Sequence, residues 1–313
     1  MKPALLVSLV ILAVGLGGLW LVIHQDLSQK QAQLQTISAK LAQLPTEVEV
    51  PVFTGTARDI QQLATISATA ALVVDKETGA ELYADNSTQP WYPASTVKMM
   101  TAIVARQIYP LDRLLTVREE AFADGSTIGF QIGEQLTVRD LLAILLIHSG
   151  NDAAFVLANN APGGYNHFVE LMNLQAKELG LTSTHFVNSS GLDDPEQQTS
   201  AEDLAKIGAR LLEDPLLAQF VRTKYLTVSD ASGRISHPLV NRDELLGVVP
   251  GVIGIKTGTT EAAGENLVTA VQAGNRQTIL VLLGSSQRYP EMTQLMRWVN
   301  SHYSWKTVRP PAE

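Results

Sequence analysis

The stretches Ala70-Ala-Leu-Val-Val-Asp75 and Thr278-Ile-Leu-Val-Leu-Leu283 decide the fold of this chain. Both are short, continuous apolar runs rich in valine and leucine, which is typical of buried β-strands. The first run is followed by a polar turn at 76–79 and by Ala80–Ala84, and this order predicts a β-hairpin. The second run is preceded by another short, mainly apolar stretch, Leu267–Val271, which also predicts a strand. Strands are therefore expected near both ends of the folded part of the chain.

Helices are expected between these two groups of strands. Apolar residues recur at helical spacing in five segments: Thr96–Ile108, Thr137–Ile147, Asn166–Leu179, Ala201–Leu212 and the closing segment Glu291–His302. Strands from both ends of a chain can form one sheet beside an inserted group of helices, which is an α+β architecture. We therefore predict the α+β class.

The first residues of the chain predict a membrane anchor. Ala4–Ile23 is an almost unbroken apolar run, long enough to span a hydrocarbon core of roughly 30 Å. Lys2 precedes the run and no acidic residue does, which favours an outward orientation for the rest of the chain. The alternative is a cleaved signal peptide, whose apolar stretch is usually only about 7–15 residues long. We expect a single-pass protein of the cytoplasmic membrane, held through residues 4–23, with its folded domain on the outer face.

The chain is expected to have four parts. An anchor takes residues 1–24, and a helical stalk and linker takes residues 25–52, where leucine and isoleucine recur at heptad-like spacing until Pro45. The repeat covers fewer than three heptads, so a solvated helix is favoured over a coiled coil. The folded domain is expected at 53–305 and a short tail at 306–313.

Composition excludes several classes of function. The net charge is −8 and no block of lysine or arginine occurs, so nucleic-acid binding is disfavoured. The chain has no cysteine, which excludes disulfides, cysteine zinc sites and a cysteine nucleophile. Its six histidines have no spacing typical of metal ligands. We expect neither a metal nor a cofactor.

Ser95 and Lys98 are the first candidate pair for catalysis. They stand three residues apart where a helix is expected to begin, so both lie on one helix face. A serine hydroxyl becomes a nucleophile when a base takes its proton, and a lysine whose pKa is lowered can be that base. Taken alone, the pair is explained as well by a helix-capping serine and a surface lysine.

Ser149 and Asn151 follow the apolar segment that ends at Ile147. Ser149 offers a second hydroxyl for proton relay, and Asn151 offers an amide that can hold a peptide carbonyl. The ordinary alternative is a polar turn in which Gly150 ends the helix.

Gly254-Ile-Lys-Thr-Gly-Thr259 supplies a third motif on an expected strand. Lys256 beside Thr257 can bind a carboxylate and lower the pKa of a nearby lysine. Gly258 would let the backbone of a ligand approach closely. The alternative is a solvated lysine at the edge of a sheet.

Together the three motifs outweigh these alternatives. S-x-x-K, S-x-N and K-T-G in this order are close to the set found in class A β-lactamases and penicillin-binding proteins. Each also falls in a fitting context: the start of a helix, the junction between a helix and a loop, and a strand.

The likeness extends beyond the three motifs. Residues 60–303 resemble the D-alanyl-D-alanine carboxypeptidase family, the serine peptidases of the low-molecular-mass penicillin-binding group. The stretches that carry it are Asp124-Gly-Ser126, Gly133-Glu-Gln-Leu-Thr-Val-Arg-Asp-Leu-Leu142, Ser149-Gly-Asn-Asp-Ala153, Asn188-Ser-Ser-Gly-Leu192 and Gly254-Ile-Lys-Thr-Gly258. This resemblance implies the DD-peptidase/β-lactamase-like fold, an antiparallel sheet packed against a helical cluster.

The resemblance also assigns roles. Ser95 would be the acylated nucleophile, Lys98 its base, and Ser149 with Asn151 the second wall of the site. Substrate binding would fall to the residues Lys256, Thr257, Gly258, Thr259 and Arg288. The backbone N–H groups of Ser95 and Thr259 would form the oxyanion hole. Thr259 stands where bulkier residues are common in the family, so substrate preference is expected to differ.

The predicted function is a serine-type D-Ala-D-Ala carboxypeptidase that trims peptidoglycan stem peptides in cell-wall biogenesis. Its partners would be stem peptides ending in D-Ala-D-Ala, with β-lactams as covalent inhibitors. A DD-endopeptidase using the same site and a class A-like β-lactamase are the alternatives, followed by a non-catalytic wall-binding protein. The β-lactamase is disfavoured because the chain has Ser149-Gly-Asn151 in place of S-D-N.

Overall fold

The computed structural model describes residues 24–25, 28–31, 35, 47–56, 66–118 and 124–309. The chain divides into two compact units, Pro51–Trp305 and Met1–Val50 with Lys306–Glu313. The anchor expected at residues 4–23 lies outside the described residues, and so do the leucine and isoleucine positions of the repeat: Leu27, Leu34, Ile37, Leu41 and Leu44. Within the described part of the chain, no helix combines the length and apolar character needed to cross a membrane.

An antiparallel sheet forms the centre of the larger unit. In the described residues it has five strands in the order β3-β2-β10-β9-β8. These strands are β2 (Ala70–Asp75), β3 (Glu81–Asp85), β8 (Val252–Thr260), β9 (Gly264–Ala273) and β10 (Arg276–Ser285). In this sheet Val281 of β10 lies opposite Leu72 of β2 on one side and Val268 of β9 on the other. The predicted pairing of strands from both ends of the chain is confirmed.

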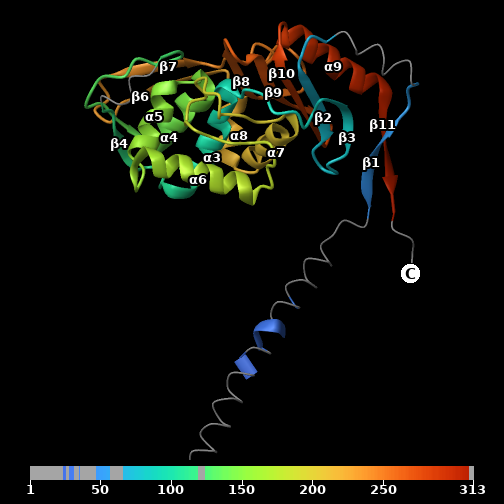
Figure 1. Cartoon of the computed structure of the whole chain (residues 1–313), viewed down its shortest axis with the longest axis horizontal. Coiled ribbons are helices and arrows are strands. Elements are labelled where there is room, and N and C mark those ends of the chain that lie inside the picture. Colours follow the sequence, from blue (N-terminus) through green and yellow to red (C-terminus); the bar gives the residue numbers. More distant parts are fainter. Residues whose placement is uncertain are drawn as a thin grey trace, which may run out of the picture. The chain divides into compact units, whose positions relative to one another are not determined.

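The segment between the strands is mainly helical, as predicted. It contains the 3₁₀-helix η1 (Ala94–Val97), α3 (Lys98–Ile108), α4 (Val138–Ala143), the π-helix η3 (Ile144–His148), α5 (Asn151–Asn159), α6 (Gly164–Glu178), α7 (Ala201–Leu212) and α8 (Pro215–Arg222). After the last strand of the sheet comes α9 (Arg288–His302). Figure 1 shows α9 on one face of the sheet and the other helices on the opposite face.

Side chains of the central strands alternate between two apolar cores. On β10, Ile279, Val281 and Leu283 belong to the core shared with helices α3 to α8. Leu280 and Leu282 of the same strand pack in a second core with α9. A strand buried on both faces needs apolar residues at successive positions, which is why β10 is a continuous apolar run.

Two helices differ from their expected form. The helix expected from Thr96 begins two residues earlier with η1, and the α-helical part starts only at Lys98. The helix expected at Thr137–Ile147 changes at Ile144 into a wider π-helical turn. Apolar spacing predicts which face is buried, but it does not distinguish these neighbouring helix types. Single π-turns occur frequently at functional sites.

A two-stranded sheet occupies residues expected as linker and tail. Val48–Phe53, predicted to be part of a linker, forms β1, which pairs with β11 (Tyr303–Val308). Residues 306–308, expected in the tail, belong to β11. Val48, Val50 and Val52 alternate with other residues, which is the period of a strand. The linker was predicted because residues 45–54 contain two prolines and no helical period, but proline is tolerated in an edge strand.

Two small hairpins, which the sequence did not predict, border the helices. They pair β4 (Leu114–Thr116) with β5 (Gln135–Thr137), and β6 (Tyr225–Ser229) with β7 (Ser236–Val240). In the first hairpin, β4 precedes the loop 124–134 in the sequence and β5 follows it, so their pairing brings the two ends of this segment together.

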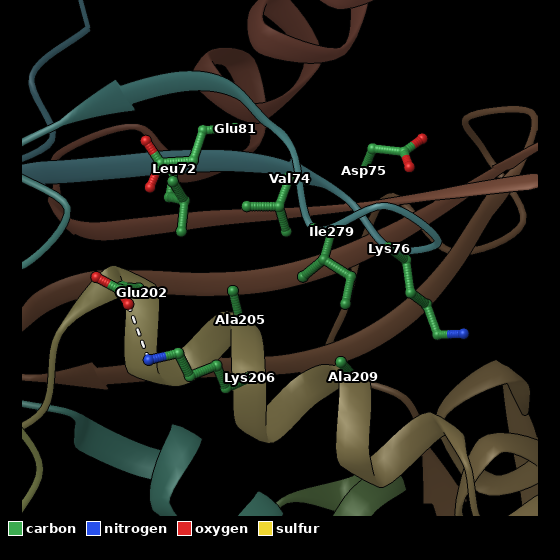
Figure 2. Close-up of a pocket in the computed structure, with 11 residues that line it drawn as sticks. Leu72, Val74, Asp75, Lys76, Glu81, Glu202, Ala205, Lys206, Ala209 and Ile279 are labelled. Atoms are coloured by element: carbon green, nitrogen blue, oxygen red, sulfur yellow. Dashed lines mark ion pairs between the residues drawn. The ribbon is translucent and has the colours of Figure 1, made fainter. Parts of the chain in front are cut away.

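A cavity of about 240 Å³ lies between the sheet and α7, as Figure 2 shows. Leu72, Val74 and Ile279 give it an apolar wall, and an ion pair of 2.8 Å between Lys206 Nζ and Glu202 Oε1 stands at its rim. None of the catalytic motif residues lines this cavity.

Candidate active site

Ser95 lies on η1, and the chain leading to it is fastened to the sheet. Asn266 of β9, which is fully buried, donates from Nδ2 to the carbonyl oxygens of Tyr92 (2.9 Å) and Pro93 (3.0 Å). The next residue, Ala94, has a φ of +49°, which is unfavourable for a residue with a Cβ. Such a conformation persists only where the surroundings enforce it. The contacts of Asn266 supply that constraint next to Ser95.

Two glycines allow other segments to approach Ser95 closely. A Cβ on Gly258 would lie 2.9 Å from the Ser95 nitrogen, and a Cβ on Gly191 would lie 1.9 Å from the Ala94 carbonyl oxygen. Gly191 also has a φ of +90°. The close approach of a ligand backbone expected at Gly258 stays a prediction, but the glycine of the K-T-G motif also has a structural role. It allows close packing of β8 on the segment that carries Ser95.

Lys98 is completely buried and meets three oxygen atoms. Its Nζ lies 2.8 Å from Ser95 Oγ, 2.6 Å from Asn151 Oδ1 and 2.5 Å from the carbonyl oxygen of Ser190. The carbonyl and amide oxygens can only accept hydrogen bonds, whereas the serine hydroxyl can also donate one. A neutral amine has two N–H donors and one lone pair, so it satisfies this set while accepting the hydroxyl proton of Ser95.

Electrostatics favour the neutral form of Lys98. Burial lowers its pKa well below the ordinary lysine value, and the nearby positive charge of Lys256 lowers it further. The carboxylate of Asp152 opposes these effects by raising the pKa. The dominant cause is the loss of hydration, which penalises the charged ammonium.

Asn151 is fixed on both sides of its amide. Besides the contact of Oδ1 with Lys98, its Nδ2 donates to the carbonyl oxygen of Asp124 at 2.6 Å. Its backbone nitrogen donates to the carbonyl oxygen of Ser126 at 2.7 Å. We expected this amide to hold a peptide carbonyl, but in the described structure it joins Lys98 to the 124–134 loop.

Ser149 occupies a left-handed conformation, with φ +67° and ψ +32°, directly after the π-helix η3. This conformation ends the helix and places the side chain toward β8. Lys256 Nζ donates to Ser149 Oγ at 2.8 Å and to the carbonyl oxygen of Thr257 at 2.9 Å. A second buried pair of amine and hydroxyl therefore stands beside the first.

Lys256 is only 2% exposed, and its pKa is lowered to about 7. Burial is the main cause, followed by the positive charges of Arg288 and Arg242, while Asp243 acts in the opposite direction. The charge of Lys256 is therefore expected to respond to pH in the neutral range.

Arg288 lies beside the K-T-G strand, in keeping with the substrate-binding role that the family resemblance implied for it. Its Nη1 donates to the carbonyl oxygen of Gly258 at 2.9 Å and to Thr259 Oγ1 at 2.6 Å. Thr257 is buried, whereas Thr259 is exposed at the end of β8. The structure therefore brings all nine sequence-predicted site residues into the region where η1, the end of η3 and β8 meet.

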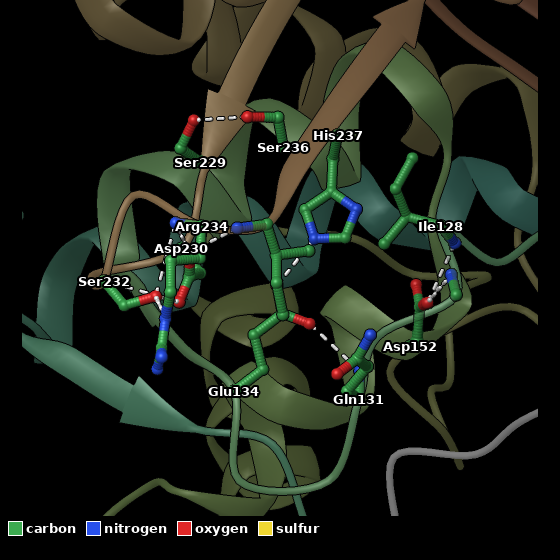
Figure 3. A network of polar contacts seen from close by, with 12 residues as sticks. Ile128, Gln131, Glu134, Asp152, Ser229, Asp230, Ser232, Arg234, Ser236 and His237 are labelled. Carbon is green, nitrogen blue, oxygen red and sulfur yellow. Dashed lines mark hydrogen bonds and ion pairs between the residues drawn. The ribbon is translucent and has the colours of Figure 1, made fainter.

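Polar contacts of Glu134, His237 and Asp152 hold the 124–134 loop in place (Figure 3). His237 Nε2 of β7 lies 2.6 Å from Glu134 Oε1, and both side chains are nearly inaccessible. The other oxygen of Glu134 accepts from the backbone nitrogen of Gln131 at 3.0 Å. Asp152 Oδ2 accepts from the backbone nitrogens of Ile128 and Gly129. The loop that contacts Asn151 is thus held by two carboxylates.

The comparisons with known proteins agree with this arrangement. The model of the peptidase S11 family, the D-alanyl-D-alanine carboxypeptidases, matches residues 56–287. The chain belongs to this family. Relatives among the S11 peptidases include the D-alanyl-D-alanine carboxypeptidases DacF of Bacillus subtilis, which is 33% identical, and DacA of Haemophilus influenzae, which is 34% identical. These alignments cover 75% and 87% of this chain, and 63% and 72% of the respective relatives.

Solved structures of similar proteins have the same fold. The DD-transpeptidase of a Streptomyces strain superposes with a TM-score of 0.72 at 28% identity, covering 76% of this chain and 98% of that one. Penicillin binding protein 6B of Escherichia coli superposes with a TM-score of 0.69 at 33% identity, covering 78% and 84%. The predicted DD-peptidase fold is confirmed. Against several curated carboxypeptidase relatives, however, the match spans less than two thirds of their length.

Sequence reasoning missed two kinds of residue at the site: residues that act through their backbone, and polar side chains outside the three motifs. Ser190, whose carbonyl oxygen contacts Lys98, and Gly191, which has no Cβ, both lie in the stretch 188–192. This stretch carried the family resemblance, but no role was assigned to its residues. Asn266 gave no signal, because a single asparagine in a strand does not reveal which carbonyls it contacts. Arg242 was also missed, although its Nη2 lies 3.0 Å from His148 Nε2, next to Ser149.

Replacing Gly191 by alanine should displace the segment that carries Ser95. The substitution adds left-handed strain of about 1–2 kcal/mol and a clash with backbone atoms that cannot move independently. We expect a lower unfolding midpoint and a loss of at least tenfold in the rate at which labelled penicillin acylates Ser95, equivalent to roughly 1.4 kcal/mol. Gly233→Ala is the matched control, because Gly233 has a φ of +69° and open space around it. Equal acylation rates in the two variants would contradict the proposed contact.

Proposed function

We propose that this chain is a serine-type D-Ala-D-Ala carboxypeptidase that removes the last D-alanine from peptidoglycan stem peptides. The observation that carries the proposal is the pairing of two buried lysine amines with two serine hydroxyls, each at 2.8 Å. Membership of the S11 peptidases and the named carboxypeptidase relatives support the same reaction.

Acylation begins when Ser95 Oγ attacks the carbonyl carbon between the two terminal D-alanines and its proton passes to neutral Lys98. The backbone N–H groups of Ser95 and Thr259 are the proposed donors to the oxyanion that develops. The C–N bond then breaks, and the leaving amine takes a proton from Lys98, for which the hydroxyl of Ser149, itself bonded to Lys256, is the proposed relay. D-Alanine departs, and the stem peptide remains as an ester on Ser95.

Hydrolysis returns the enzyme to its starting state. A water molecule attacks the ester carbonyl while Lys98 takes one of its protons, and that proton returns to Ser95 Oγ as the ester bond breaks. Charged Lys256, with Thr257, Thr259 and Arg288, is proposed to hold the terminal carboxylate of the substrate. β-Lactams would acylate Ser95 by the same first step.

The rival β-lactamase reaction requires a carboxylate that drives rapid deacylation. Asp152 is the carboxylate that acts electrostatically on Lys98. Its two oxygens accept from the backbone nitrogens of Ile128, Gly129 and Ala153. This arrangement gives Asp152 a structural role in the 124–134 loop and favours a peptidase over a β-lactamase.

Defined muropeptides analysed by mass spectrometry test the reaction itself. We expect the wild-type protein to release one alanine from a stem ending in D-Ala-D-Ala, and Ser95→Ala to lose on the order of a thousandfold or more of this rate. Ser232→Ala, at an exposed hairpin tip, serves as the matched control. Cleavage of a crosslinked dimer without loss of terminal alanine would replace the proposal with an endopeptidase, the activity named for a Pseudomonas aeruginosa relative that is 33% identical. Rapid turnover of penicillin would favour the β-lactamase.

The pH dependence of KM tests the role of Lys256. Its amine is charged below its pKa of about 7 and neutral above it, so binding of a carboxylate weakens as the pH rises through this range. Above about pH 7, we expect KM for a D-Ala-D-Ala peptide to rise by no more than roughly tenfold per pH unit. Arg242→Gln removes one charge that lowers this pKa, so it should move the rise in KM to higher pH. Arg113→Gln, on an exposed loop, should leave the profile in place, and a flat wild-type profile would exclude this role for Lys256.

We also propose that residues 4–23 anchor the chain in the cytoplasmic membrane with the catalytic domain outside. The support is the long apolar run and the preceding Lys2. The full-length protein should remain in membranes after an alkaline wash and retain its first residues by intact-mass measurement. A variant that starts at residue 25 should be recovered in the soluble fraction. A mature protein that begins after residue 23 would instead identify the segment as a cleaved signal.

A further inference from the structure

A second cavity, of about 230 Å³, lies beside the segment that carries Ser95. Its lining residues are Pro90, Trp91, Tyr92, Pro195, Gln197 and Gln198. One wall runs directly into Ser95, which follows Tyr92 by three positions. The other wall belongs to the loop that also provides the Ser190 carbonyl and Gly191. Both walls are therefore continuous with the two segments that meet at Lys98.

Backbone contacts fix this cavity in place. Trp91 and Thr199 exchange backbone hydrogen bonds of 2.7 and 2.9 Å, and Trp91 Nε1 donates to the carbonyl oxygen of Ala263 at 2.9 Å. The buried Gln197 side chain accepts from the backbone nitrogens of Val187 and Asn188. A cavity held by such contacts is formed before any ligand arrives, which reduces the entropy lost on binding.

The lining indicates the chemistry of its ligand. None of the residues that form the cavity carries a formal charge, and two are aromatic. The Gln198 side chain is exposed and offers both an amide donor and an acceptor. Asp193, Asp194 and Glu196 on the same loop disfavour an anion. Pockets for drug-sized ligands begin at about 300 Å³, so this smaller cavity suits a single neutral, polar ring.

We propose that this cavity binds one N-acetylated amino-sugar of the peptidoglycan glycan strand while Ser95 attacks the attached stem peptide. The inference deepens the proposed function and rests on it. Aromatic rings can pack on the apolar face of a sugar, and Gln198 can bond its hydroxyl or acetamido groups. The cavity in Figure 2 is less suitable, because charged side chains stand at its rim and it is not built from the segments beside Ser95.

The reach of the substrate is compatible with this placement. Three residues of extended chain span at most about 11 Å, which limits the separation of the Tyr92 and Ser95 Cα atoms. Four extended residues of a stem peptide, from the sugar to the scissile bond, span about 14 Å. A stem peptide can therefore connect a sugar in the cavity with the Ser95 hydroxyl without stretching.

Kinetics with paired substrates test the proposal. The wild-type protein is compared on a free pentapeptide ending in D-Ala-D-Ala and on the same peptide attached to the N-acetylglucosaminyl-N-acetylmuramyl disaccharide. We expect kcat/KM to be about tenfold higher for the disaccharide substrate. Tyr92→Ala and Gln198→Ala should each reduce this ratio to about two or less. The matched controls Tyr225→Ala and Gln219→Ala change exposed side chains on β6 and α8 and should preserve the ratio.

The ratio corrects for a general loss of activity in any variant, and thermal melting identifies a variant that does not fold. A wild-type ratio near one, or an unchanged ratio in both cavity variants, would overturn the glycan site while leaving the carboxypeptidase intact. Failure to release alanine from either substrate would instead overturn the proposed function. Titration of Ser95→Ala protein with the disaccharide alone then tests the cavity directly. Chemical-shift changes that Gln198→Ala abolishes would support it, and their absence would exclude it.

Discussion

Two lysine amines buried within one cluster impose the constraint on which the rest of the site depends. A buried ammonium loses its hydration, and two of them in proximity also repel one another. The protein avoids this cost because burial lowers the pKa of both amines. Lys98 lies among two carbonyl-type oxygens and the Ser95 hydroxyl, a set that a neutral amine satisfies, and the pKa of Lys256 falls to about 7. In the proposed mechanism the same arrangement supplies a base for Ser95 and leaves one cation for the substrate. Stability and chemistry therefore require the same contacts.

The fold meets this constraint by bringing segments distant in sequence to one place. The sheet provides Lys256 on β8 and, through Asn266 on β9, holds the backbone before Ser95. The helical cluster provides Lys98 and, at the end of a π-turn, Ser149. Close packing between these parts requires that Gly191 and Gly258 lack side chains. Strain at Ala94 and Ser149 is maintained by the surrounding contacts, as is common where a site needs defined geometry.

The sequence predicted the parts of this arrangement that depend on composition and spacing. Continuous apolar runs predicted β2 and β10 because both are covered on two faces, and the three motifs predicted the residues that meet around Lys98. Contacts made by backbone atoms were harder to predict from the sequence. The Ser190 carbonyl has no signature in its side chain, and the amide of Asn151 could equally have faced a substrate. The strand at Val48–Phe53 was missed because two prolines and the lack of a helical period favoured a linker, and the alternation of the valines was not considered. The expected anchor at residues 4–23 stays a prediction.

The relatives indicate which features separate one reaction from another. Proteins named as carboxypeptidases, an endopeptidase and a transpeptidase are all similar to this chain over about three quarters of its length. The proposed acyl-enzyme step is compatible with this likeness, because attack by an activated serine can begin all three reactions. Their difference lies in which substrate reaches Ser95 and in which nucleophile then attacks the ester. In the proposed mechanism Lys256 binds a carboxylate that all these substrates share, so the two choices would depend on the end of β8 near Thr259 and Arg288 and on the surfaces beside the Ser95 segment. Substrate selection can therefore change in this fold without disturbing the buried amines on which the chemistry depends.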